Sequence, residues 1–247
     1  MNRGCGGSDA LRGLGARRGD GAETAPALGR REVVGGLVAV LPLLLAERAG
    51  AAPARIPPVP PPAIRFDVLR EGAVIGEHLV DFARLDGGYS VQTRIEIAVR
   101  ILGVKVFEFR HKSTEVWKKD RLVTFESKTR DDDSEFFVDG RATASGFEMT
   151  NRKGVETAPA DIMVASYWTP EIARQTLLID PQRGRVKPQQ LVATDTLAVP
   201  VAGASVNTTR YRLTGITNGW VAYDDRGRWL AAELQKKGSD ILYRQQG

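Results

Sequence analysis

Apolar and polar residues alternate along most of the chain beyond residue 63, and the run from Tyr89 to Ile101 is the clearest example. Every second residue of this run shares one face, namely Tyr89, Val91, Thr93, Ile95, Ile97, Val99 and Ile101, whereas the positions between them are mostly polar. Side chains of a β-strand point alternately to opposite faces, so this period of two predicts a long strand with one buried face.

Runs on either side predict further strands. They cover residues 65–71, 74–84, 105–117, 122–130, 135–138, 141–150, 190–200, 207–215, 220–224, 228–235 and 240–244. Asp86-Gly87, Asp139-Gly140 and Asn218-Gly219 mark turns, because glycine accepts the positive φ that tight hairpins require. Ten to twelve successive strands with short connections predict an antiparallel meander, and so long a sheet tends to curl.

The expected fold class is therefore all-β: an antiparallel meander curled into a half-open or closed barrel, with one short helix. The helix is expected over residues 160–167, with a further turn near residues 170–175.

A segment near the N-terminus has the three parts of a signal peptide. Arg30 and Arg31 precede an apolar run over residues 33–46, and small residues that suit cleavage follow over 49–54. The paired arginines resemble the twin-arginine export signal, and a general secretory signal is the other reading. The apolar run is shorter than the roughly 20 residues of a membrane-spanning helix. We expect an extension and signal peptide over 1–54, a proline-rich linker over 55–63 and one β domain over 64–247, without a transmembrane helix after processing.

Charge and cysteine usage narrow the function classes. Residues 1–54 hold seven Lys or Arg and five Asp or Glu. The rest of the chain has 28 basic and 25 acidic residues, and the two signs are interleaved. Nucleic-acid binding needs clustered cations, so no nucleic-acid partner is expected. The only cysteine, Cys5, lies in the leader, so the processed domain has no disulfide or thiolate chemistry.

Three stretches of the domain resemble a family known as domain of unknown function 6134 and its larger relative, family 3108. They are residues 66–76, residues 166–170 with 177–180, and residues 220–229 with 238–243. The resemblance implies an exported bacterial envelope protein with a β-rich fold. It brings no established activity, so no catalytic residue is carried over. Some domains of this kind resemble half-barrels that hold lipids or lipoprotein tails, an analogy of fold alone.

Two histidines are the first candidate site residues. His78 alternates in register with Val80 and Phe82, and His111 shares a face with Phe109 and Glu115. If these faces line a barrel interior, the imidazoles form either a polar spot with an acid/base partner in Glu115 or ordinary hydrogen-bonded core residues. Two histidines without cysteine do not predict a zinc site.

Aromatic and acidic clusters have two readings each. The aromatic residues line a ligand pocket or fill the core; they are Trp117, Tyr167, Trp168, Trp220, Tyr223 and Trp229. The run Asp131–Asp133 binds calcium or forms a solvated hairpin tip. No nucleophile elbow or phosphate-binding loop occurs, so we assign no catalytic residue, metal site or cofactor.

The leading hypothesis is a non-catalytic periplasmic protein whose curved sheet binds a lipid, another hydrophobic molecule or an envelope component. The candidate ligand-binding residues are His78, His111, Glu115, Trp117, Trp168, Trp220 and Tyr223. One alternative is a structural or protein-interaction module. The other is a hydrolase-type enzyme, with Glu115, His111 and Asp224 as its first candidates. The sequence indicates neither a particular ligand nor an oligomeric state.

Overall fold

The computed structural model describes residues 56–57, 60–102, 104–236 and 238–246 of the 247-residue chain. The expected leader over residues 1–54, with Arg30 and Arg31, lies outside the described residues. Within them no helix is long and apolar enough to cross a membrane. Ile56, in the proline-rich segment, is buried against the core of the β domain.

Fifteen strands and one short helix make up the regular structure of the described residues. The first eight strands are β1 (Ile64–Arg70), β2 (Ala73–Leu85), β3 (Gly88–Ile101), β4 (Val104–Lys118), β5 (Arg121–Asp131), β6 (Ser134–Ala142), β7 (Phe147–Asn151) and β8 (Gly154–Ala158). The remaining elements are β9 (Met163–Val164), α1 (Pro170–Ala173), β10 (Leu177–Ile179), β11 (Val186–Val201), β12 (Ala204–Gly215), β13 (Gly219–Tyr223), β14 (Trp229–Lys236) and β15 (Ser239–Gln245). The all-β class with one short helix is confirmed.

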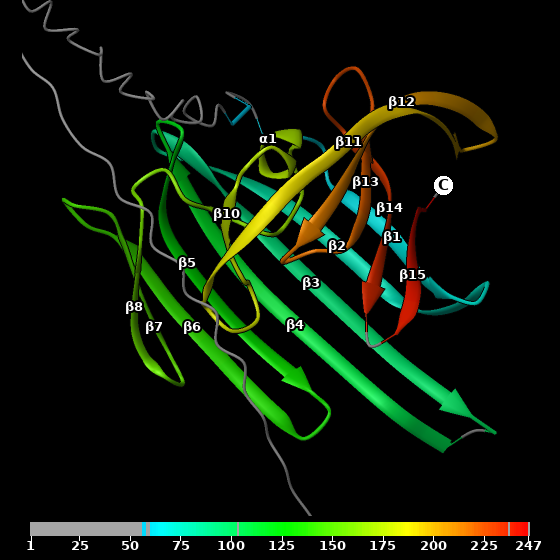
Figure 1. Ribbon diagram of the computed structural model, residues 1–247, viewed down its shortest axis with the longest axis horizontal. Coiled ribbons are helices and arrows are strands. Elements are labelled where there is room, and N and C mark those ends of the chain that lie inside the picture. Colours follow the sequence, from blue (N-terminus) through cyan, green and yellow to red (C-terminus); the bar gives the residue numbers. More distant parts are fainter. Residues whose placement is uncertain (1–55, 58–59, 103, 237, 247) are drawn as a thin grey trace, which may run out of the picture. The chain divides into compact units, whose positions relative to one another are not determined.

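The strands form a single sheet made of two meanders (Figure 1). Strands β1 to β8 pair in succession as antiparallel neighbours, strands β10 to β15 do the same, and β9 pairs with β10 in parallel. An antiparallel ladder between β1 and β15, in which Phe66 lies opposite Gln245, joins the two meanders. Strands β8 and β9 are the edges, and no ladder between described residues connects them. The barrel is therefore half-open.

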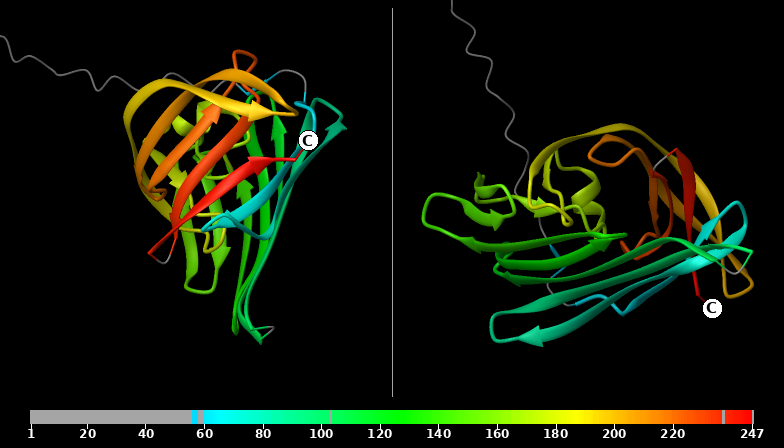
Figure 2. Two further views of the ribbon diagram at one scale, coloured as in Figure 1. Left: turned by 90° about the vertical axis from the view of Figure 1, so that its right-hand side faces the viewer. Right: turned by 90° about the horizontal axis from the view of Figure 1, so that it is seen from below.

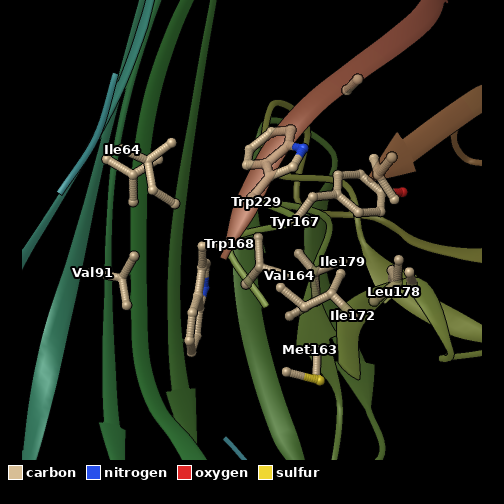
Figure 3. Packing of buried hydrophobic residues seen from close by; sticks show 14 of the residues in the cluster. Ile64, Val91, Met163, Val164, Tyr167, Trp168, Ile172, Leu178, Ile179 and Trp229 are labelled. Carbon is tan, nitrogen blue, oxygen red and sulfur yellow. The ribbon is translucent and has the colours of Figure 1, made fainter. Parts of the chain in front are cut away.

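The interior of the barrel is filled by residues 159–185, which connect β8 to β11. In Figure 2, α1 and the loops beside it lie between the green strands of one wall and the yellow-to-orange strands of the other. Figure 3 shows Trp168 of this segment reaching toward Val91 of β3, with Tyr167 near Trp229 of β14. We call residues 159–185 the plug.

Aromatic contacts fix the plug to both walls. The Trp168 ring meets Phe82, Tyr89 and Trp117 edge-on, at centroid distances of 5.7, 5.9 and 5.9 Å. On the opposite wall, the Tyr223 hydroxyl donates to the Tyr167 carbonyl oxygen at 2.8 Å. Edge-to-face pairs add to the stabilisation that burial provides, so the plug is part of the hydrophobic core.

The expectation of a helix over residues 160–167 is wrong. Met163 and Val164 instead form strand β9, whose backbone pairs with β10 and whose side chains are fully buried. Tyr167 has a φ of 54°, which a right-handed helix does not accept. The helix forms at the second expected place and covers residues 170–173.

The expected turn at Asp139-Gly140 is also wrong, because both residues lie inside β6. Gly140 is needed there for space: a Cβ atom would approach Cε1 of Phe147 to 2.6 Å. The chain turns later, where the Thr143 amide donates to the Gly146 carbonyl oxygen at 2.8 Å. The strand expected over 141–150 is therefore divided between β6 and β7.

Candidate functional site

An apolar chamber of about 390 Å³ opens at one end of the barrel. Its wall comes mainly from the inward faces of β3 and β4, because alternate residues of each strand point to the same side. Strand β15 supplies the facing wall. The apolar lining residues are Ile75, Ile95, Ile97, Val99, Val106, Phe107, Phe109, Ile241 and Tyr243. The shared face expected for Ile95 and Ile97 of β3 is therefore confirmed, and it points inward.

Two cationic side chains lie at the rim of this chamber. Arg70, at the end of β1, lies opposite Ile241 of β15, and Lys236 lies opposite Ser239. Residues directly opposite in a ladder share a face, so both cations belong to the inner side of the sheet. Protein packed around Lys236 lowers the pKa of its ammonium group; Asp180 opposes this effect, and Lys187 and Arg183 add to it.

A smaller, polar cavity of about 170 Å³ lies deeper in the barrel, between the plug and the walls. His78 of β2, Thr93 of β3 and His111 of β4 line one side. On the plug side, Asp180 lies 3.1 Å from the ammonium of Lys187 and accepts hydrogen bonds from backbone amides of the following turn. This cavity has the chemistry to bind a polar group.

His78 is buried with no hydrogen-bond partner among the described residues for either ring nitrogen. Its imidazole lies edge-on to the rings of Trp229 and Tyr243, at centroid distances of 5.4 and 5.6 Å. Burial lowers the pKa of His78 to about 3, with a further contribution from His111. The ring is therefore neutral at physiological pH and offers one donor and one acceptor.

The contacts of the described residues include no hydrogen bond or ion pair between His111 and Glu115, so they favour the reading of core residues over that of an acid/base pair. The ring of His111 is paired through Nδ1 with the Thr129 hydroxyl at 2.8 Å. Burial lowers the pKa of His111 to about 4. Glu115 lies elsewhere in the core, where its Oε2 accepts from the indole N–H groups of Trp117 at 2.9 Å and Trp168 at 3.3 Å. Burial raises the pKa of this carboxyl to about 7.

Of the six aromatic residues considered together, Tyr167 and Trp229 line the polar cavity, and the other four lie in the core or on the outer face. Trp117, Trp168 and Tyr223 are fully buried and pack against the plug or within it. Trp220 lies on the other side of the sheet, beside the small cluster around Ala222, and its indole donates to Glu233 at 3.3 Å. None of these four residues lines the chamber or the polar cavity.

The acidic candidates have structural contacts. Asp132 has a φ of 52° at the hairpin tip, and its carboxylate accepts from the Glu108 amide at 2.8 Å. Asp224 accepts from the amides of Arg226 and Arg228 and fixes the turn before β14. No group of three or more potential metal ligands occurs within the described part of the chain.

Sequence reasoning missed the two rim cations. A usable signal was present for Lys236, because it continues the inward series Ala232 and Leu234 at the end of β14. Arg70 similarly follows the buried Val68 by two positions on β1. The pairing of β1 with β15, which places the two cations at one rim, involves residues far apart in sequence and left no local signal.

Comparisons with known proteins identify the domain but no activity. A family model described as a domain of unknown function, DUF6134, matches residues 66–246. No curated protein matches the chain. Among solved structures, a crystal structure of a beta-barrel-like protein of the domain of unknown function DUF1849, from Brucella abortus, is similar with a TM-score of 0.55 and 14% identity. The match covers 74% of this chain and 94% of that one, and at this identity it concerns the fold alone.

Proposed function

The chain belongs to the DUF6134 family, and from that premise we propose that it is a non-catalytic protein of the bacterial cell envelope that binds a hydrophobic ligand in the apolar chamber. The observation that carries this proposal is the chamber itself, which is open, about 390 Å³ in volume and lined mainly by aliphatic and aromatic side chains. Ligand pockets typically begin at about 300 Å³ and combine such a lining with a few polar groups.

The energetics of the chamber favour a ligand with an extended hydrocarbon part. Burial of each methylene group stabilises a complex by about 0.8 kcal/mol, so a short acyl or prenyl segment supplies several kcal/mol. The barrel is filled by the plug at its middle, which leaves the end between β3, β4 and β15 for such a segment.

The non-catalytic character is supported by the contacts of the three residues first considered for hydrolysis. Glu115 is bonded to two indoles, His111 to a threonine hydroxyl and Asp224 to backbone amides. Each of these three side chains thus has a structural partner, which supports the proposal of a non-catalytic protein. Export to the periplasm rests on the sequence around Arg30 and Arg31, and it places the chamber in the compartment where envelope lipids pass.

Native mass spectrometry of the protein purified from the periplasm tests the function and the location together. We expect a bound small molecule of hydrophobic character. Val99→Trp adds bulk to a chamber wall and should remove that molecule, whereas Val192→Trp, at a position of β11 that is 58% exposed, should retain it. A ligand that survives Val99→Trp would disprove the chamber as its site, and protein recovered only from the cytosol would disprove the location.

A protein-interaction module is the second candidate, favoured by exposed apolar residues at the β3–β4 hairpin. Leu102 is 99% exposed and Val104 65% exposed, near the end of the hairpin that extends at the lower right of Figure 1. Exposed apolar groups of this kind mark interaction surfaces. For this candidate we expect a protein partner in the native mass spectrum that is lost in the double variant Leu102→Ser, Val104→Ser and kept in Val192→Ser.

A further inference from the structure

The apolar chamber and the polar cavity meet inside the barrel. Four residues line both spaces: Ile95, Gln182, Lys236 and Tyr243. The chamber beyond this junction is lined mainly by apolar side chains of β3 and β4, with Arg70, Asp131 and Ser239 also in its lining. The cavity on the other side has a larger share of histidine, hydroxyl and charged residues. A molecule that occupies both must have one apolar and one polar end.

Cations outnumber acids around the junction, because Lys236, Lys187 and Arg183 line the polar cavity together with Asp180. Lys236 lines both spaces and makes no ion pair or hydrogen bond with another described residue, whereas the nearby Lys187 is paired with Asp180 at 3.1 Å. The guanidinium of Arg183 lies over the Phe136 ring, 4.7 Å from its centroid. The ammonium of Lys236 is therefore the cation that remains to interact with a ligand at the junction.

The polar cavity also contains buried groups that lack partners. Both ring nitrogens of His78 and the hydroxyl of Thr93 have no hydrogen-bond partner in the described chain, although both residues are over 90% buried and line the cavity. A buried polar group without a hydrogen bond destabilises the folded protein, so such groups are retained where something else bonds to them. An oxygen-rich group in the cavity would accept from Thr93 and from the protonated nitrogen of His78.

We propose that the ligand is a single-chain amphiphile with an acidic head group, a carboxylate or a phosphate. The head lies at the junction against Lys236, with His78 and Thr93 on its inner side. The hydrocarbon chain extends along Ile97 and Phe109 toward the open end of the chamber. This inference rests on the proposed function and adds to it the class of ligand and the direction in which the ligand lies.

Three probes of equal chain length test the inference on the full chain: dodecanoate, dodecyl phosphate and dodecanol, each titrated below its aggregation threshold. We expect the acids to bind about tenfold more tightly than the alcohol, since a hydrogen bond to a charged group is among the stronger ones. Lys236→Gln should abolish this preference and leave the affinity for dodecanol unchanged. Lys128→Gln, an exposed lysine of β5, is the matched control and should retain the preference.

The outcomes separate the two proposals. Equal affinity for acids and alcohol, or a preference that survives Lys236→Gln, would overturn the head-group assignment and leave the hydrophobic site intact. If none of the three probes binds, the proposed function itself fails. A preference for only one of the two acids supports the inference and identifies the head group. Far-ultraviolet circular dichroism of each variant establishes that a lost preference does not reflect unfolding.

Discussion

Replacement of His78 by phenylalanine tests whether burial holds this imidazole neutral inside the folded barrel. The ring lies among Phe66, Trp229 and Tyr243, at centroid distances of 6.3, 5.4 and 5.6 Å, and makes no hydrogen bond with the described residues. Phenylalanine keeps an aromatic ring in that place and removes both nitrogens. The change therefore isolates the cost of burying the polar ring.

The magnitude follows from the shift in pKa. The ordinary pKa of histidine is 6.5, and burial lowers that of His78 to about 3. As the pH falls below 6.5, the unfolded chain binds a proton that the folded protein does not, so the free energy of unfolding decreases. Between pH 6.5 and pH 4.5 the free energy of unfolding decreases by about 1.36 kcal/mol per pH unit, or about 3 kcal/mol in all.

Urea unfolding of ligand-free protein at pH 4.5 and pH 7.5 measures the effect. From pH 7.5 to pH 4.5, the free energy of unfolding of the wild-type protein should decrease by about 3 kcal/mol more than that of His78→Phe. At pH 7.5 the variant should be at least as stable as the wild type, because two unpaired nitrogens are gone. The control is His111→Phe, which should be less stable at pH 7.5 because it leaves the hydroxyl of Thr129 without its partner.

Parallel pH dependence in the wild type and His78→Phe would refute the reasoning. It would mean that the imidazole is protonated or hydrated inside the folded barrel. The ligand-free state matters, because a bound acid would pair with the ring and change its pKa.

Three further predictions concern stability. In the wild type, the free energy of unfolding should fall by about 3 kcal/mol as the pH rises from about 4.5 to about 7, because the folded Glu115 carboxyl, with a pKa of about 7, retains a proton that the unfolded chain releases. Glu115→Gln should remove this decrease. The same pH dependence of urea unfolding in variant and wild type would contradict this prediction. Trp168→Ala should cost about 3–5 kcal/mol at pH 7.5 by leaving a cavity in the plug, and a cost below about 1 kcal/mol in urea unfolding would show that the plug is not part of the core. Asp224→Ala should cost about 2 kcal/mol through the loss of its bonds to the amides of Arg226 and Arg228, whereas the exposed neighbour Asp225→Ala should be neutral in thermal unfolding.

The alternation of apolar and polar residues was sufficient to predict most strands and their inner faces. The alternation is informative for β3 because residues two apart on a strand share a side. Ile95 and Ile97 therefore point the same way, and in the structure both line the interior. Glycine turns such as Asp86-Gly87 were predictable for the same local reason, since Gly87 has a φ of 71°.

Local signals failed where a residue serves a distant neighbour. Gly140 gives the same sequence signal as a hairpin turn, yet it lies inside a strand to leave room for Phe147. The plug has no regular period, because its side chains meet walls on several sides. A helix over residues 160–167 was therefore a reasonable but wrong reading of buried residues that form β9.

The sequence by itself determined that this chain forms strands, which residues of β3 share one face, and which apolar residues share a face with each histidine. Only the tertiary structure decided that the two meanders join through β1 and β15, that Trp220 lies on the outer side, and that Lys236 meets an apolar chamber. The physical reason is the range of the interactions. Side-chain alternation is imposed by the backbone of a few consecutive residues, whereas the walls of a cavity are chosen by the packing of segments that lie far apart in the chain.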